Sequence, residues 1–188
     1  MTRMARLRAA GPRAILRALR PVRVDELLYG VGAHDTLPPS ACSAHVDIAR
    51  FDRQSLSGDA AVDRRLDGRR VCYVARVDGR VAHRSWLHLD TVLPSLFGFA
   101  AAPVVGDCAT DPAFRGLHLY PHVLAHIVAD VRARGMATEV HVLVSPDNVA
   151  SIRGIERAGF RLLDRLRGVR VGPFVLRQPA PAGRAPSA

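Results

Sequence analysis

A short stretch near the middle of the chain has the residue types of an anion site. The segment DPAFRGLHLYPHVL runs from Asp111 to Leu124 and follows the apolar run APVVGDCAT. We expect a strand to end there and a helix to open with its first backbone N–H groups free, which suits a phosphate. Gly116 would let the backbone approach such a ligand, and Arg115 adds a fixed positive charge. The same junction also joins many strands to helices that bind nothing.

Three histidines in and after this stretch suggest a second kind of chemistry, the binding of a metal ion. His118, His122 and His126 are spaced four residues apart, which could build a metal-binding face on a helix. Pro121 indicates that the helix begins close to it, which removes His118 from that face. We therefore expect no metal site here and histidines that face solvent or a ligand, with His118 able to contact a phosphate when protonated.

The elements that must position these residues form an α+β pattern. Residues 69–89 alternate in the manner of a β-hairpin with its turn at Asp78-Gly79. The pattern then predicts a buried strand over 103–110, a helix over 119–135, a strand over 137–145, a helix over 147–160, and one or two strands over 161–177. A strand–helix–strand unit makes one parallel pair through a right-handed crossover. Residues 22–66 read as helical in pieces, and residues 91–102 as a loop or edge segment.

Composition sets the organisation of the chain and the class of partner. The 188 residues are enough for a single domain, which we place at 23–177, between a basic leader (1–22) and a Pro/Ala-rich tail (178–188) expected to be disordered. The net charge is +10, and arginine supplies all of the positive charge, since the sequence has no lysine. This charge favours acidic ligands but does not indicate which kind. No stretch is long and apolar enough to span a bilayer, and no secretory signal is visible, so we expect a cytoplasmic protein.

The leader allows two interpretations. Its apolar residues Leu7, Ile15, Leu16 and Leu19 could share a helical face, although Pro12 interrupts the run. A solvated or docked terminal helix is the expected arrangement, with a weak membrane-surface role as the alternative. We predict no membrane association and leave a homodimer open.

Taken together, two motifs resemble the GCN5-related N-acetyltransferase (GNAT) superfamily. CATDPAFRGLHLYPHVL is similar to the strand–loop–helix of that family, and NVASIRGIERAGF is similar to its second helix, which ends in Gly-Phe. The gap between the motifs fits one helix and one strand, and the resemblance covers roughly residues 65 to 170. It implies a mixed, mostly antiparallel central sheet with a splayed parallel strand pair and flanking helices.

The resemblance also implies an acyl-CoA co-substrate, most simply acetyl-CoA, and a set of contacts to it. The backbone N–H groups from Gly116 to Tyr120 would face the diphosphate. The pantetheine arm would lie between the splayed strands, opposite Asn148 and Ser151. The cofactor-binding residues expected on this basis are Cys108, Ala109, Thr110, Arg115, Gly116, Leu117, His118, Leu119, Tyr120, Asn148 and Ser151. The alternatives that involve no ligand are that Asn148 only caps its helix and that Ser151 only forms a local hydrogen bond.

The sequence departs from the family at three positions. His118 stands where the family usually has Gly, and Tyr120 where it has Gly or Ala. Ile155 stands where many members have a tyrosine that protonates the departing thiolate. A thiol has a pKa of about 8.5, so the thiolate is a tolerable leaving group without that acid. Asp107 is the predicted general base because it lies on the strand beside the thioester. Glu139, His83 and His88 are the other candidates.

The sequence therefore predicts an acyl-CoA-dependent N-acyltransferase. A primary amine of a small acceptor would attack the thioester directly in a ternary complex, and the positive charge of the chain favours an acceptor that is acidic or nucleotide-linked. The first alternative is a degenerate acyltransferase fold that serves as a non-catalytic binding module, which His118 and Ile155 favour. Nucleic-acid binding through the arginines comes last, because the sequence holds no nucleic-acid motif and aromatic residues make up only 5%.

Overall fold

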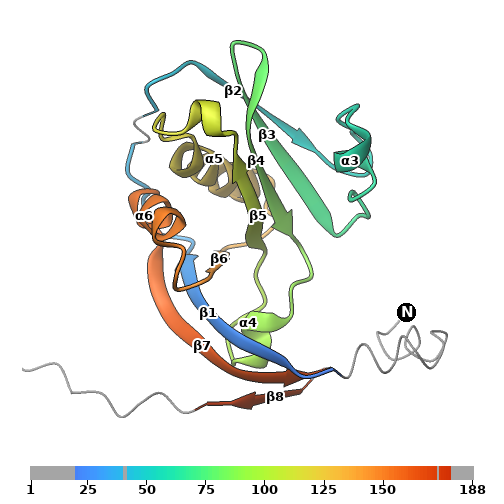
Figure 1. Cartoon of the computed structure of the whole chain (residues 1–188), viewed down its shortest axis with the longest axis vertical. Helices are drawn as coiled ribbons and strands as arrows, with labels where there is room; N and C mark the ends of the chain where they lie inside the picture. The colour runs from blue at the N-terminus through green and yellow to red at the C-terminus, as the bar shows by residue number, and fades with distance from the viewer. Residues whose placement is uncertain (1–19, 40–41, 173, 179–188) are drawn as a thin grey trace, which may run out of the picture.

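The structure is a computed structural model that describes residues 20–39, 42–172 and 174–178 (Figure 1). The predicted basic leader and Pro/Ala-rich tail therefore lie almost entirely outside the described residues. In the part of the chain that is described, no helix is long and apolar enough to cross a bilayer.

One mixed sheet runs through the described part of the chain. Its strand order is β2-β3-β4-β5-β6-β1-β7-β8, and every neighbouring pair is antiparallel except β5–β6. The predicted α+β class and the mostly antiparallel mixed sheet are confirmed. The strands are β1 (Val22–Val31), β2 (Val46–Phe51), β3 (Arg70–Val77), β4 (Arg80–His88), β5 (Val104–Thr110), β6 (Val140–Val144), β7 (Arg161–Val171) and β8 (Phe174–Arg177). The helices are α3 (Ala60–Asp63), α4 (Leu93–Leu96), a 3-10 turn η1 (Pro112–Phe114), α5 (Leu119–Ala133) and α6 (Val149–Arg157).

The prediction of helical pieces over residues 22–66 is wrong. This segment holds strands β1 and β2, and its only helix within the described residues is the four-residue α3. β1 lies between β6 and β7 and is covered on both faces, so the adjacent side chains Leu28 and Tyr29 are both buried. A strand buried on both faces loses the alternation that identifies a strand from sequence. An irregularity in the β1–β7 register between Leu28 and Tyr29 disturbs the pattern further.

The sheet is split along its parallel pair. β5 and β6 pair only through Val104 with His141 and Val105 with Val142, after which the two strands separate. The separation begins next to a bulge in β5, where Asp107 has a left-handed φ of 49° and the register with β4 shifts. Bulges of this kind bend a strand and leave an extra residue outside the ladder. The predicted splayed pair is thus confirmed, and Figure 1 shows the sheet opening between β5 and β6.

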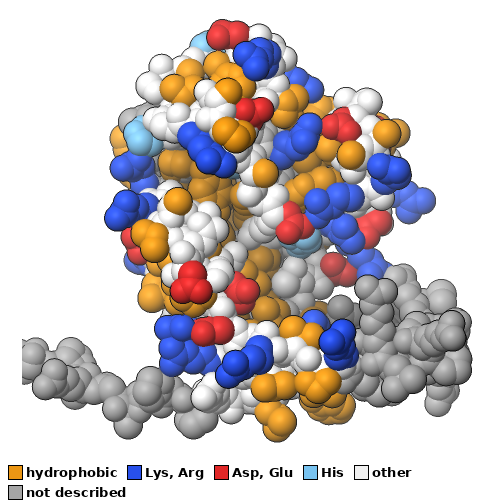
Figure 2. Space-filling view, in the orientation of Figure 1, with side chains coloured by type: hydrophobic (Ala, Val, Ile, Leu, Met, Phe, Trp, Pro, Cys, Tyr) orange, Lys and Arg blue, Asp and Glu red, His pale blue; other side chains and the backbone are white. Residues whose placement is uncertain are grey.

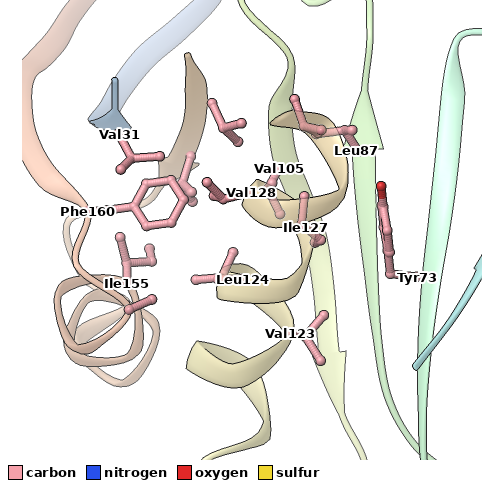
Figure 3. Packing of buried hydrophobic residues seen from close by; sticks show 14 of the residues in the cluster. Val31, Tyr73, Leu87, Val105, Val123, Leu124, Ile127, Val128, Ile155 and Phe160 are labelled. Atoms are coloured by element: carbon pink, nitrogen blue, oxygen red, sulfur yellow. The ribbon is translucent and has the colours of Figure 1, made fainter. Parts of the chain in front are cut away.

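Two faces of the sheet carry different layers. α5 packs on one face, where Val123, Leu124, Ile127, Val128 and Val131 are fully buried. Figure 3 shows α5 side chains meeting β-strand residues on one side and Ile155 and Phe160 on the other. α3 covers the opposite face through a separate cluster made by Val62, Leu66, Cys72, Val74 and Trp86. Each fully buried aliphatic side chain contributes about 1.5–3 kcal/mol, so α5 anchors the loop that precedes it.

Candidate functional site

The loop before α5 has an unusual backbone. Asp111 accepts a hydrogen bond from the Ala113 N–H (2.9 Å) and so caps η1. Gly116 then takes a left-handed φ of 87°, and His118, the N-cap of α5, takes a left-handed φ of 57°. Left-handed backbone is uncommon for residues other than glycine and often marks a functional turn. The two left-handed residues turn the chain between η1 and the start of α5.

The first amides of α5 are open. Within the described residues, the backbone N–H groups of Gly116, Leu117, His118, Leu119 and Tyr120 donate to no carbonyl and no side chain. The side chain of His118 does not cap the helix either. Free N–H groups at a helix N-terminus carry a partial positive charge and attract anions. The loop therefore offers the set of donors that the sequence predicted.

Three arginines surround these donors. A cavity of about 240 Å³ lies beside the loop, and Arg115, Arg153 and Arg157 line it together with Thr110, Gly116, His118 and the first turn of α5. The Arg157 guanidinium donates to His118 Nδ1 at 2.6 Å, so the imidazole lies toward α6. Sequence reasoning missed Arg153 and Arg157. Their four-residue spacing on a helix that faces the loop was the available signal.

A second cavity fills the gap between the splayed strands. It has a volume of about 250 Å³, and its lining residues are Gly106, Asp107, Cys108, Tyr120, Leu143, Val144, Ser145, Asn148 and Ser151. Asn148 also caps α6 by accepting from the Ser151 N–H at 3.2 Å. The first cavity adds Thr110, Arg115, Gly116, His118 and Leu119 to this set, and Tyr120 lines both cavities. Of the predicted site residues, Ala109 and Leu117 line neither one.

A buried polar chain runs behind the wall of the second cavity. The ring nitrogens of His83 lie 2.7 Å from Thr110 Oγ1 and 2.8 Å from Ser85 Oγ, and the Ser85 hydroxyl donates to Cys108 Sγ at 3.2 Å. Burial lowers the pKa of His83 to about 4, so the imidazole is neutral near pH 7. Burial raises the pKa of the Cys108 thiol to about 11, despite hydrogen bonds from Ser85 and Tyr120. These hydrogen bonds tie β4 to Cys108 and Thr110 of β5.

The tyrosine of the first α5 turn stands between the two cavities. The Tyr120 ring lies 5.6 Å from the His83 ring, and its hydroxyl is close enough to Cys108 for the two groups to affect each other's titration. Burial, with the Cys108 contact, raises the pKa of Tyr120 well above its usual range, so the phenol keeps its proton. Ile155 is fully buried in the core beneath α5 (Figure 3). The phenol at this site therefore comes from Tyr120 on α5, which sequence reasoning considered only for its backbone amide.

The predicted base lies on the other face of the sheet. Asp107 forms an ion pair with Arg65, and His88 Nε2 is 3.7 Å from the same carboxylate oxygen. The Arg65 guanidinium also lies over the Trp86 ring, 4.2 Å from its centroid. Burial lowers the pKa of His88, while Asp107 acts in the opposite direction. Asp107 and Cys108 are neighbours in β5, so the cavity between the strands connects two chemically different faces.

The remaining features add no competing site. Among the residues that the structure describes, no group of three or more His, Cys, Asp or Glu side chains is placed to hold a metal ion. A hollow of about 690 Å³ beside β1, β7 and β8 is larger, but it contains none of the predicted residues and no helix N-terminus. On the face seen in Figure 2, arginines are spread over both halves of the molecule and do not form one patch.

No protein-family model matches the sequence, and no curated protein matches it. Solved structures do resemble the fold. A GNAT-family protein from Novosphingobium aromaticivorans superposes with a TM-score of 0.54 at 21% identity, over 78% of this chain and 63% of its own. A GNAT-family acetyltransferase from Colwellia psychrerythraea gives 0.53 at 15% identity, over 78% of this chain and 55% of its own. A GCN5-related N-acetyltransferase from Kribbella flavida gives 0.54 at 16% identity, over 81% and 60%.

The fold of this chain is that of the GNAT superfamily, as the sequence predicted. The chain spans only 55–63% of the length of these three structures. The likeness extends to the architecture, and the chemistry of the site is argued from the residues of this chain.

Proposed function

We propose that this protein is an acyl-CoA-dependent N-acyltransferase, with acetyl-CoA as the simplest donor. One observation carries the proposal: the open amides at the start of α5 lie next to a cavity that runs between two splayed parallel strands. The donors suit a diphosphate, and the gap suits an extended arm that can pair with strand backbone. The likeness to GNAT structures supports the same activity.

Acyl-CoA fits the site as the co-substrate. Its diphosphate would be held by the amides from Gly116 to Tyr120, with Arg153 and Arg157 supplying positive charge from α6. Its pantetheine arm would enter the gap along β5, facing Asn148 and Ser151. The thioester would then lie near the bulge, where the extra residue in β5 leaves backbone outside the β4 ladder and able to polarise the carbonyl.

The reaction in this arrangement is a direct transfer. The acceptor amine attacks the thioester carbon, a carbon–nitrogen bond forms, and the carbon–sulfur bond breaks. Asp107 is placed to take the proton of the amine, and the Tyr120 hydroxyl, which contacts a sulfur atom in the structure, is placed to donate a hydrogen bond to the departing thiolate. Most of the rate enhancement would come from positioning and from backbone donors.

A thiol-release assay tests the proposal. The purified chain is incubated with acetyl-CoA and a panel of primary amines, and free CoA is followed with a chromogenic thiol reagent. Amine-dependent release, with the acetylated amine seen by mass spectrometry, is the expected result. Tight acetyl-CoA binding without release for any amine would support the alternative, a binding module. The buried Ile155 favours that alternative, because it stands where many family members have a tyrosine that acts as general acid.

A further inference from the structure

The mouth of the strand gap holds an ion pair that a substrate can replace. Asp107 lines the cavity, and its carboxylate is paired with the guanidinium of Arg65. Both side chains are well exposed, at 54% for Asp107 and 40% for Arg65, so solvent and solutes reach the pair. Exposed ion pairs contribute little to stability, so the fold does not depend on this one.

Arg65 is held in place by contacts other than Asp107. Its guanidinium lies over the Trp86 ring at 4.2 Å, and the flanking residues Val62 and Leu66 are buried against the same tryptophan. A cation over an aromatic face is attracted to the ring by about 0.5–1 kcal/mol at an exposed site, and this attraction remains when another partner leaves. Arg65 can therefore exchange Asp107 for a different anion without moving away from the cavity mouth.

The pair lies on the face opposite the proposed CoA entrance. Trp86 belongs to the cluster under α3, whereas α5 and its open amides belong to the cluster on the other face. Figure 1 shows α3 and α5 on opposite sides of the β3–β4 hairpin. An acceptor would approach the thioester from the side of the ion pair, and its reacting amine would meet Asp107 first.

We propose that the acceptor is a zwitterion: a primary amine with a carboxylate or phosphate a few bonds away. Its ammonium group replaces Arg65 as the partner of Asp107, and its anionic group takes the freed Arg65. Each charge of the ion pair thus gains a new partner, and neither is left unpaired. Loss of the Arg65 contact also frees the Asp107 carboxylate to accept the proton of the amine. This inference rests on the proposed function and names its acceptor class.

Matched pairs of amines test the acceptor class. Glycine is compared with glycinamide, and phosphoethanolamine with ethanolamine, in the thiol-release assay at saturating acetyl-CoA. We expect kcat/KM to favour the zwitterion by about tenfold or more in the wild-type chain, as a charge-assisted hydrogen bond allows. In Arg65→Gln the preference should disappear through a higher KM for the zwitterion alone. Arg64→Gln is the control, because within the described residues the side chain of that exposed neighbour donates only to Ala60 O at the start of α3.

A binding readout is available that needs no turnover. Trp86 is the sole tryptophan of the chain and lies directly under Arg65. Titration with glycine or phosphoethanolamine should therefore change its fluorescence, whereas glycinamide and ethanolamine should not, and Arg65→Gln should abolish the response.

The outcomes separate the two proposals. Equal kcat/KM for both members of each pair, or an equal loss for both in Arg65→Gln, overturns the zwitterion and leaves the acyltransferase standing. No CoA release with any amine overturns the acyltransferase, and the acceptor class falls with it.

Discussion

The ring of Tyr120 occupies the space that a side chain at position 154 would need. A Cβ added to Gly154 would lie 2.7 Å from Tyr120 Cδ1, well inside van der Waals contact. Gly154 is in the middle of α6, where glycine is normally unfavourable by about 1 kcal/mol relative to alanine. The glycine and the tyrosine are therefore a matched pair, and both line the cavity beside the loop.

The close contact predicts that substitutions at Tyr120 and Gly154 have strongly non-additive effects on the free energy of unfolding. Gly154→Ala should destabilise the chain by about 1 kcal/mol, because overpacking against the buried ring exceeds the gain in helix propensity. In a Tyr120→Ala background the same substitution should stabilise, since the ring is gone. Urea unfolding of the four variants measures the coupling. Additive effects would show that the ring and the glycine do not constrain each other.

Asp107→Asn should lower kcat with little change in acetyl-CoA affinity. The amide has nearly the same shape as the carboxylate but cannot take a proton from the acceptor. We expect a loss of about 100-fold in kcat, the usual contribution of a general base. Steady-state kinetics and calorimetry on the same preparation give both values. A wild-type rate would remove Asp107 from the chemistry and leave His88, which lies 3.7 Å from it, as the next candidate.

The α6 arginines should contribute to acyl-CoA affinity. Arg153→Ala and Arg157→Ala are each expected to weaken acetyl-CoA binding by about tenfold, since each removes one charge-assisted contact to phosphate. The dependence of affinity on salt should become less steep in both variants. Arg53→Ala is the control, because Arg53 is exposed and lines neither cavity. The same small effect in all three variants would mean that only net charge matters.

Stability should fall in mild acid. Burial lowers the pKa of His83 from 6.5 to about 4, and it also lowers those of His88 and His141. The unfolded chain therefore binds more protons than the folded one below pH 6.5, so stability is complete above that pH and is lost as the pH falls toward 4. His83 alone should cost about 2 kcal/mol at pH 5.

Urea unfolding at pH 7, 6 and 5 checks this dependence. His83→Gln should be less stable at pH 7, because it disturbs the bonds to Thr110 and Ser85, but its stability should change less with pH. A variant that keeps the full wild-type pH dependence would show that His83 is not the group that titrates.

Much of the fold could be predicted because the responsible signals are local. The hairpin turn at Asp78-Gly79, the strand before the loop and the apolar face of α5 depend on residues close in sequence, and the structure confirms each one. β1 escaped prediction because it lies between two partners that follow it by more than a hundred residues. Its Leu27-Leu28-Tyr29 run is apolar on both faces for a reason that only the assembled sheet supplies.

The geometry of the candidate site could be predicted for its backbone and less well for its side chains. Loop amides and strand ends follow from the order of elements, so the residues around Gly116 and Asn148 could be named. The left-handed φ of Asp107 could not be predicted, because it depends on the register between β4 and β5 and on the separation of β6 from β5. Two side-chain contacts could not be predicted either: Tyr120 against Gly154, and Arg65 with Asp107. Each joins residues more than thirty positions apart, and a single sequence does not show that such residues meet.

The central claim is that the open amides before α5 bind the diphosphate of an acyl-CoA. Isothermal titration of acetyl-CoA into the wild-type chain and into Gly116→Asp tests it most directly. Gly116 has a left-handed φ of 87°, which strains any side chain placed there, and open space around its Cβ position. Aspartate would put a negative charge beside the amides, and Gly116→Ala, which carries the same backbone strain without the charge, is the matched control. We expect saturable binding to the wild type and its loss in the variant. Equal affinity for both proteins, or no binding to either, would contradict it.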